Sequence, residues 1–101
     1  MLVRVRIPEH LWEATGGEAN VEVSAATIAE LISAVDVVHP GFAGLLLDES
    51  GLRRYWCIHV NGRDVRWLDG LATAVSPADH IWILPTSSGG MFLPTVATKT
   101  T

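Results

Sequence analysis

The sequence predicts an α+β fold, a mixed sheet of four to five strands crossed by one main helix. Three observations lead to this class. Several short segments are uniformly apolar or alternate apolar with polar residues, which is typical of strands. One segment in the first half repeats its apolar residues at helical spacing. An Asn-Gly pair lies between two later extended segments, and this pair is the strongest short-range hairpin signal.

The first two strands are predicted at residues 2–7 and 20–24, where valines and an isoleucine alternate with polar residues. Residues 9–19 join them and contain a Gly-Gly pair. We expect Leu11 and Trp12 of this connection to fold back onto the core. Because the two extended segments are neighbours in sequence, an antiparallel pair is the simplest arrangement.

A helix follows, and its apolar residues form one stripe at Ile28, Leu31, Ile32 and Val35. Thr27 and Glu30 match a capping box, which satisfies free amide groups at a helix start. The His-Pro-Gly sequence at 39–41 ends the helical run. Residues 42–47 predict a short second helical turn, and the polar residues 48–54 predict a loop.

The next strand is predicted at residues 55–60 and turns back at Asn61-Gly62. The resulting cross-strand pairs would be Val60 with Arg63, Ile58 with Val65, and Trp56 with Trp67. Residues 68–75 are expected to be irregular and residues 76–79 to form a turn. The last strand, at 80–84, is apolar on both faces and therefore suits the middle of the sheet. Placed parallel to the first strand, it completes a β-grasp arrangement.

After the last strand the chain passes Pro85 and small polar residues and reaches Gly89-Gly90. We interpret this segment as a tether that carries a reactive terminus. Glycine has no Cβ, so its backbone can closely approach a ligand in a narrow channel. The chain then continues through residues 91–101, which complicates the interpretation.

The final third of the chain resembles the sulfur-carrier branch of the ubiquitin-like proteins, the ThiS and MoaD group. The resemblance is carried by Val60-Asn61-Gly62, Asp64, Leu71, Asp79, the apolar strand at 81–84, Pro85 and Gly89-Gly90. Within the group, residues 64–67 and 70–74 look most like the CysO carriers of cysteine biosynthesis. The resemblance covers residues 1–90 and implies a β-grasp sulfur-carrier domain that ends in a Gly-Gly tail.

This resemblance implies that the protein is a carrier acted on by enzymes, with no catalytic residue and no bound cofactor. An E1-like adenylating enzyme of the MoeB/ThiF type would use ATP to activate Gly90, and a sulfur donor would convert it to a thiocarboxylate. The tail that threads into partner active sites would comprise Pro85, Thr86, Ser87, Ser88 and Gly89. The sulfur acceptor would be a PLP-dependent cysteine synthase or an enzyme of secondary metabolism.

With residues 91–101 attached, Gly90 has no free carboxylate to activate. We therefore expect a proform that a JAMM-type zinc metalloprotease cuts between Gly90 and Met91. The alternative is that residues 91–101 are a disordered extension or a cloning remnant. Two other functions stay open. One is the MoaD role as the small subunit of molybdopterin synthase, and the other is a non-catalytic β-grasp interaction module with the Gly-Gly pair as a mere linker.

Other residues give weaker signals. Cys57 could relay sulfur, but a small strand residue packed in the fold is the more common case. The histidines at 10, 39, 59 and 80 are scattered without ligand-like spacing, so no metal site is expected. Trp67 and Trp82 fit either an exposed partner-facing surface, where Trp is common, or the core.

Composition sets the remaining limits. The 101 residues suggest one domain, and the formal charge of −4 argues against nucleic acid as a partner. No stretch approaches the roughly 20 apolar residues needed to span a bilayer, and the start does not resemble a signal peptide. One cysteine allows no intrachain disulfide and suits a reducing compartment. A cytoplasmic protein without membrane contact is expected.

Overall fold

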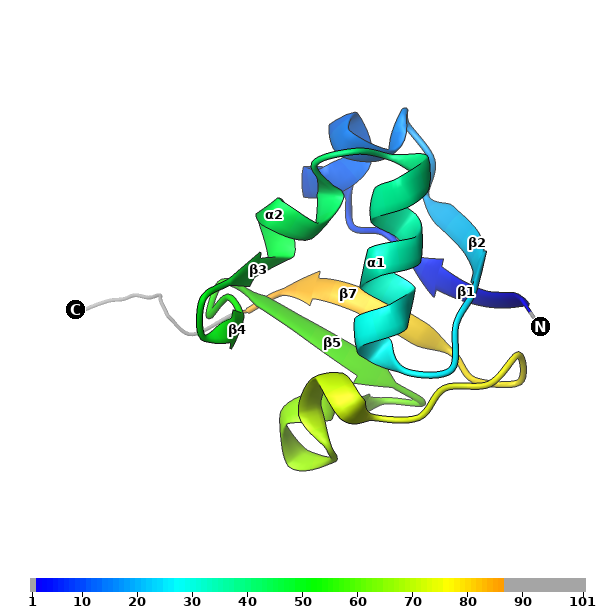
Figure 1. Ribbon diagram of the computed structural model, residues 1–101, viewed down its shortest axis with the longest axis vertical. Coiled ribbons are helices and arrows are strands. Elements are labelled where there is room, and N and C mark those ends of the chain that lie inside the picture. Colours follow the sequence, from blue (N-terminus) through cyan, green and yellow to red (C-terminus); the bar gives the residue numbers. More distant parts are fainter. Residues whose placement is uncertain (1, 87–101) are drawn as a thin grey trace.

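The computed structural model describes residues 2–86 and contains a five-stranded mixed sheet with the order β2-β1-β7-β5-β6. The strands are β1 (Leu2–Arg6), β2 (Asn20–Ser24), β5 (Trp56–Val60), β6 (Arg63–Asp64) and β7 (Ile81–Pro85). Helix α1 (Ile28–Val38) lies across one face of this sheet (Figure 1). The predicted β-grasp arrangement of one main helix on a mixed sheet is thereby confirmed.

The last strand occupies the centre of the sheet, as predicted. β7 runs parallel to β1, where Val5 pairs with Ile81, and antiparallel to β5, where Ile58 pairs with Ile83. β1 and β2 form the expected antiparallel pair. The residues after β7 therefore continue from the central strand of the sheet.

Helix α1 begins with the predicted capping box. Thr27 Oγ1 accepts a hydrogen bond from the Glu30 amide at 3.2 Å, and Glu30 Oε1 accepts one from the Ala26 amide at 3.0 Å. The stripe predicted from spacing is fully buried. The helix ends before His39, and the expected second turn is α2 (Phe42–Leu46).

The core lies between the two helices and one face of the sheet. On β1 and β2 every second side chain is buried, which places the valines inward as predicted. The largest fully buried side chains of the core are Phe42, Ile7, Ile28, Leu31, Ile32, Leu46, Ile58, Ile81 and Ile83. Within residues 2–86, no helix combines the length and apolar character that crossing a membrane requires.

The hairpin prediction is right at the turn and wrong beyond it. Asn61 and Gly62 have φ values of 54° and 86°, as a two-residue turn requires, and Val60 pairs with Arg63. The predicted pairs of Ile58 with Val65 and Trp56 with Trp67 do not form. β6 ends at Asp64, whose Oδ1 accepts a hydrogen bond from the Arg66 amide at 2.8 Å. This cap starts the 3-10 helix η2 (Val65–Trp67), which leaves the strand register.

The three segments predicted as a connection, a loop and an irregular span each contain short regular elements. The connection after β1 forms the 3-10 helix η1 (Glu9–Thr15), where Leu11 is buried and Trp12 Nε1 donates to the Ile7 carbonyl at 2.8 Å. The predicted loop at 48–54 includes β4 (Gly51–Leu52), which pairs with β3 (Leu47–Asp48). The span before the last turn contains η3 (Gly70–Ala72). Backbone bonding within short segments explains all three, and it leaves no periodic signal.

Candidate functional site

The end of β7 fixes the place where the predicted tether begins. The strand extends one residue beyond the predicted end, because Pro85 pairs with Trp56 of β5. The Thr86 amide then donates to the Tyr55 carbonyl at 2.7 Å, and Thr86 Oγ1 donates to the Arg54 carbonyl at 3.0 Å. The first two residues of the predicted tail are thus held against the sheet, so that any reach must come from residues after Thr86.

The remaining predicted site residues lie outside the described residues. They are Ser87, Ser88, Gly89, Gly90 and Met91. The predicted activation of Gly90, the cleavage after it and the domain boundary at residue 90 therefore stay predictions.

The sheet face opposite α1 carries the exposed side chains around this exit. On β7, Ile81 and Ile83 are buried while Trp82 between them is 43% exposed, so only one face of the strand is enclosed. The strand is apolar on both faces, as its sequence indicates, but apolar residues alone do not show which face is covered. Trp67 and Trp82 were expected either on an exposed surface or in the core. Both are exposed, and Trp67 is 86% exposed.

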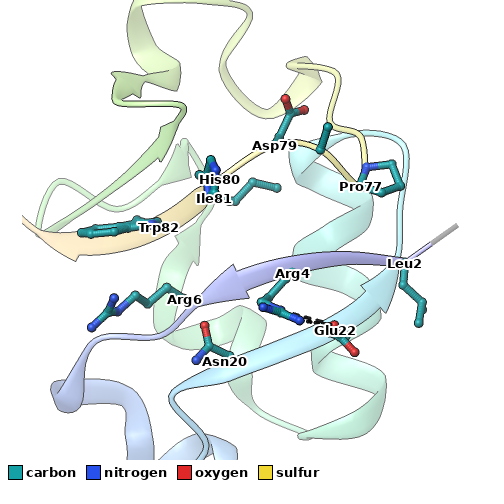
Figure 2. A pocket seen from close by; sticks show the side chains of 11 residues that line it. Leu2, Arg4, Arg6, Asn20, Glu22, Pro77, Asp79, His80, Ile81 and Trp82 are labelled. Carbon is teal, nitrogen blue, oxygen red and sulfur yellow. Dashed lines mark hydrogen bonds and ion pairs between the residues drawn. The ribbon is translucent and has the colours of Figure 1, made fainter.

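A shallow hollow of about 410 Å³ lies on the same face, where β7, β1 and β2 run side by side (Figure 2). Arg6 Cζ lies 4.9 Å from the centroid of the Trp82 ring, within cation–π range. Arg4 and Glu22 form an exposed ion pair at 3.0 Å across β1 and β2. This surface therefore combines an indole with charges of both signs. The alternation in β1 places Arg4 and Arg6 on one face, but it does not indicate what they bind.

A cluster of hydrogen bonds positions the start of β7. Asn61 Nδ2 donates to Asp79 Oδ1 at 2.9 Å, and the Ser76 amide donates to Asp79 Oδ2 at 2.8 Å. The bond from Asn61 is the main reason that the pKa of Asp79 is lowered. Asn61 Oδ1 in turn accepts from the His80 amide at 2.9 Å. The β5–β6 turn and the entry to β7 are thereby joined.

Cys57 is buried on β5, as the prediction of a packed strand residue requires. Burial raises the pKa of its thiol, and the Asp64 carboxylate raises it further. A protonated thiol is a poor nucleophile, which does not favour a sulfur relay. Cys57, His59 and Asp64 are a group of potential metal ligands within residues 2–86. His10 and His80 are exposed, and His39 lies 3.5 Å from Glu18.

Comparison with known proteins extends over nearly the whole chain. The model of the ThiS family matches residues 5–90. The sulfur carrier protein CysO of Mycobacterium tuberculosis is 40% identical over 93 residues, covering 89% of this chain and 100% of that protein. A putative sulfur carrier protein of Archaeoglobus fulgidus is 31% identical over 91 residues, with coverage of 89% and 100%.

Solved structures agree with these matches. A chain in the crystal structure of the Amycolatopsis orientalis BexX/CysO complex has a TM-score of 0.80 and 41% identity, covering 87% of this chain and 99% of that chain. The crystal structure of Mycobacterium tuberculosis CysO has a TM-score of 0.79 and 39% identity, with coverage of 84% and 99%. Together with the β-grasp topology, these matches show that the chain belongs to the ThiS family and is a sulfur carrier protein like its CysO relatives.

Proposed function

We propose that this protein carries sulfur as a thiocarboxylate on Gly90. The observation that supports this most directly is the family match, which runs through the second glycine of the Gly-Gly pair and leaves residues 91–101 outside. The hydrogen bonds of Thr86 add a physical argument. They fix the start of the tether on the central strand, so that four residues, 87–90, separate the sheet from the proposed reactive carboxylate.

The proposed chemistry has two steps. An E1-like adenylating enzyme of the MoeB/ThiF type would let a Gly90 carboxylate oxygen attack the α-phosphorus of ATP, with release of pyrophosphate. A sulfur donor would then attack the acyl carbon and displace AMP, which leaves a thiocarboxylate. This chain contributes no catalytic group to either step. Its contribution is a tether whose last two residues lack a Cβ and so fit a narrow channel.

The first step requires a free carboxylate, so residues 91–101 must be removed beforehand. We propose that a JAMM-type zinc metalloprotease cuts between Gly90 and Met91. Intact-mass spectrometry of the protein from its native cell should detect a species that ends at Gly90, part of it with sulfur in place of one oxygen. Detection of uncut chain alone, in cells that are using the carrier, would exclude the proform.

Reconstitution tests the carrier function directly. A chain ending at Gly90 is incubated with the adenylating enzyme, ATP and sulfide, and its intact mass is measured. We expect the mass gain of one sulfur replacing one oxygen. The chain of 101 residues is the matched control and should gain nothing, because its Gly90 carbonyl is an amide. A chain ending at Gly90 that stays unchanged under conditions where a known carrier reacts would contradict the proposal.

The proposed acceptor is a PLP-dependent cysteine synthase, as the similarity to the CysO carriers implies, and an enzyme of secondary metabolism is equally compatible. The thiocarboxylate would attack an aminoacrylate held on the cysteine synthase. Deletion of Gly89-Gly90 separates this function from a non-catalytic interaction module, because only the carrier loses sulfur transfer while its fold is retained. Stable co-purification with a large subunit would instead identify a MoaD-type subunit of molybdopterin synthase.

A further inference from the structure

A group of three potential metal ligands lies on the β5–β6 hairpin, apart from the tail. Cys57 and His59 are two residues apart on β5, so their side chains share a face. Asp64 pairs directly with His59 across the hairpin. One thiol, one imidazole and one carboxylate donor atom all lie within 4.8 Å of one another. Strand alternation and the register of a two-residue turn therefore bring together groups that are separated in sequence.

We propose that Cys57, His59 and Asp64 bind one Zn²⁺ ion, which displaces the proton of the Cys57 thiol to solvent, with a fourth position open to water or to a ligand from a partner. Sulfur, nitrogen and oxygen donors of these types are common in zinc sites with three protein ligands. Bond lengths of about 2.0–2.3 Å place the donors of a tetrahedral site roughly 3.3–3.7 Å apart. The donor atoms lie within 4.8 Å of one another, so zinc binding would require them to approach by about 1 Å.

The surroundings of Asp64 suit a ligand that is held in place. Its Oδ1 is bound by the Arg66 amide, which orients the carboxylate. The Arg66 guanidinium approaches Oδ2 only to 3.7 Å, because its Nη2 donates to the carbonyls of Arg53 and Trp56. Oδ2 thus keeps a lone pair for a metal. An outer group that orients a ligand in this way is typical of metal sites.

His59 and Asp64 are half-buried and Cys57 is buried, so an ion would reach the group from the side of His59 and Asp64. His59 is the member of the group that lines a hollow of about 480 Å³, together with Asn61, Gly62, His80, Trp82 and Leu84. Residues 87–101 contain no Cys, His, Asp or Glu, so they supply no competing ligand of these types. The whole chain can therefore be used as the test protein.

The test is a titration of the untagged, reduced full chain with Zn²⁺ by isothermal calorimetry, repeated with Co²⁺ as a spectroscopic probe. We expect one ion per chain and a near-ultraviolet thiolate-to-cobalt charge-transfer band. Cys57→Ser should abolish that band. His59→Gln and Asp64→Asn should each weaken Zn²⁺ binding by tenfold or more.

His80→Gln is the matched control, since His80 is exposed and lines the same hollow without belonging to the group. It should bind Zn²⁺ as the parent does. Because Cys57 is buried, its variant can lose stability, so the decision rests on the two half-buried ligands, with thermal unfolding of each variant recorded. The proposal is overturned if the parent binds no stoichiometric Zn²⁺, if His59→Gln and Asp64→Asn bind like the parent, or if His80→Gln weakens binding equally.

Discussion

Asp79 is the residue that connects the hairpin turn to the central strand. Its two carboxylate oxygens accept hydrogen bonds from the Asn61 side chain and from the Ser76 amide and hydroxyl. These donors favour the charged carboxylate, which is why the pKa of Asp79 is lowered. A group whose pKa is lowered by folding stabilises the protein above its unfolded pKa and loses that contribution as the pH falls through its folded pKa.

We predict that Asp79→Asn lowers the free energy of unfolding by about 1 kcal/mol at neutral pH, since hydrogen bonds to a charged group are replaced by neutral ones. The difference should shrink as the pH falls below the unfolded pKa of about 3.9, because the parent carboxylate then becomes protonated. Urea unfolding of both proteins between pH 7 and pH 3 measures this. A difference that does not change with pH would mean that the charge of Asp79 contributes nothing.

Gly62 is a second residue whose role can be isolated. Its φ of +86° is unfavourable for a side chain, yet a Cβ added there would meet no atom within 4 Å. Gly62→Ala should therefore cost about 1 kcal/mol of unfolding free energy through the backbone alone. Gly44→Ala is the control, because Gly44 lies in α2 with equally open space and no positive φ. Equal losses in both variants would contradict the turn geometry.

Among the elements, helix α1 is the one that the sequence predicts most completely. Its apolar stripe, capping box and end are all local signals, and each is present in the structure. The β5–β6 hairpin shows the limit of such signals. The Asn-Gly turn could be predicted from the sequence. Asp64, however, can either continue a strand or cap a 3-10 helix. In the structure it caps the 3-10 helix, because its side chain accepts a hydrogen bond from the Arg66 amide.

The capping box provides the prediction for this scale. Thr27→Ala removes the acceptor of the Glu30 amide and should lower the free energy of unfolding by about 1 kcal/mol. Ser33→Ala, on the exposed side of the same helix, should change it by less than about 0.5 kcal/mol. Chemical denaturation monitored by circular dichroism compares the two variants. A Thr27 variant as stable as the Ser33 variant would show that the cap is not needed in the folded domain.

The exit of the tail shows why part of the site could not be predicted. The Gly-Gly pair is visible in the sequence, and so is the strand before it. The bonds that hold Thr86 come from the carbonyls of Arg54 and Tyr55, which are more than thirty residues earlier in the chain. A local sequence pattern cannot show a hydrogen bond between residues so far apart in the chain. The start of the tether is therefore a property of the β5–β7 pairing.

For the whole molecule, the two faces of the sheet differ in what covers them. One face packs against helix α1 (Figure 1), and the other carries Arg6 and Trp82 (Figure 2). The alternating strands β1 and β2 allowed this division to be predicted. β7 did not, because Trp82 and Leu84 are as apolar as the buried residues between which they alternate.

The exposed face leads to a prediction about the activating enzyme. Trp82 lies on the strand that precedes the proposed tether, four residues before Thr86, so we expect an enzyme that binds the tail to contact this indole as well. Exposed tryptophans in interfaces often contribute 2 kcal/mol or more to binding. In a chain ending at Gly90, Trp82→Ala should therefore lower kcat/KM for ATP–pyrophosphate exchange about tenfold or more.

Trp67→Ala is the matched control for that substitution. Trp67 is the more exposed of the two indoles, but it lies on η2, beyond the sheet edge formed by β6. If exposure alone determined binding, its removal would have the larger effect. If position along the exit strand determines binding, only the Trp82 variant loses exchange activity, while both keep the parent's thermal midpoint within a few degrees. Equal activity of all three proteins would place the docking surface elsewhere on the fold.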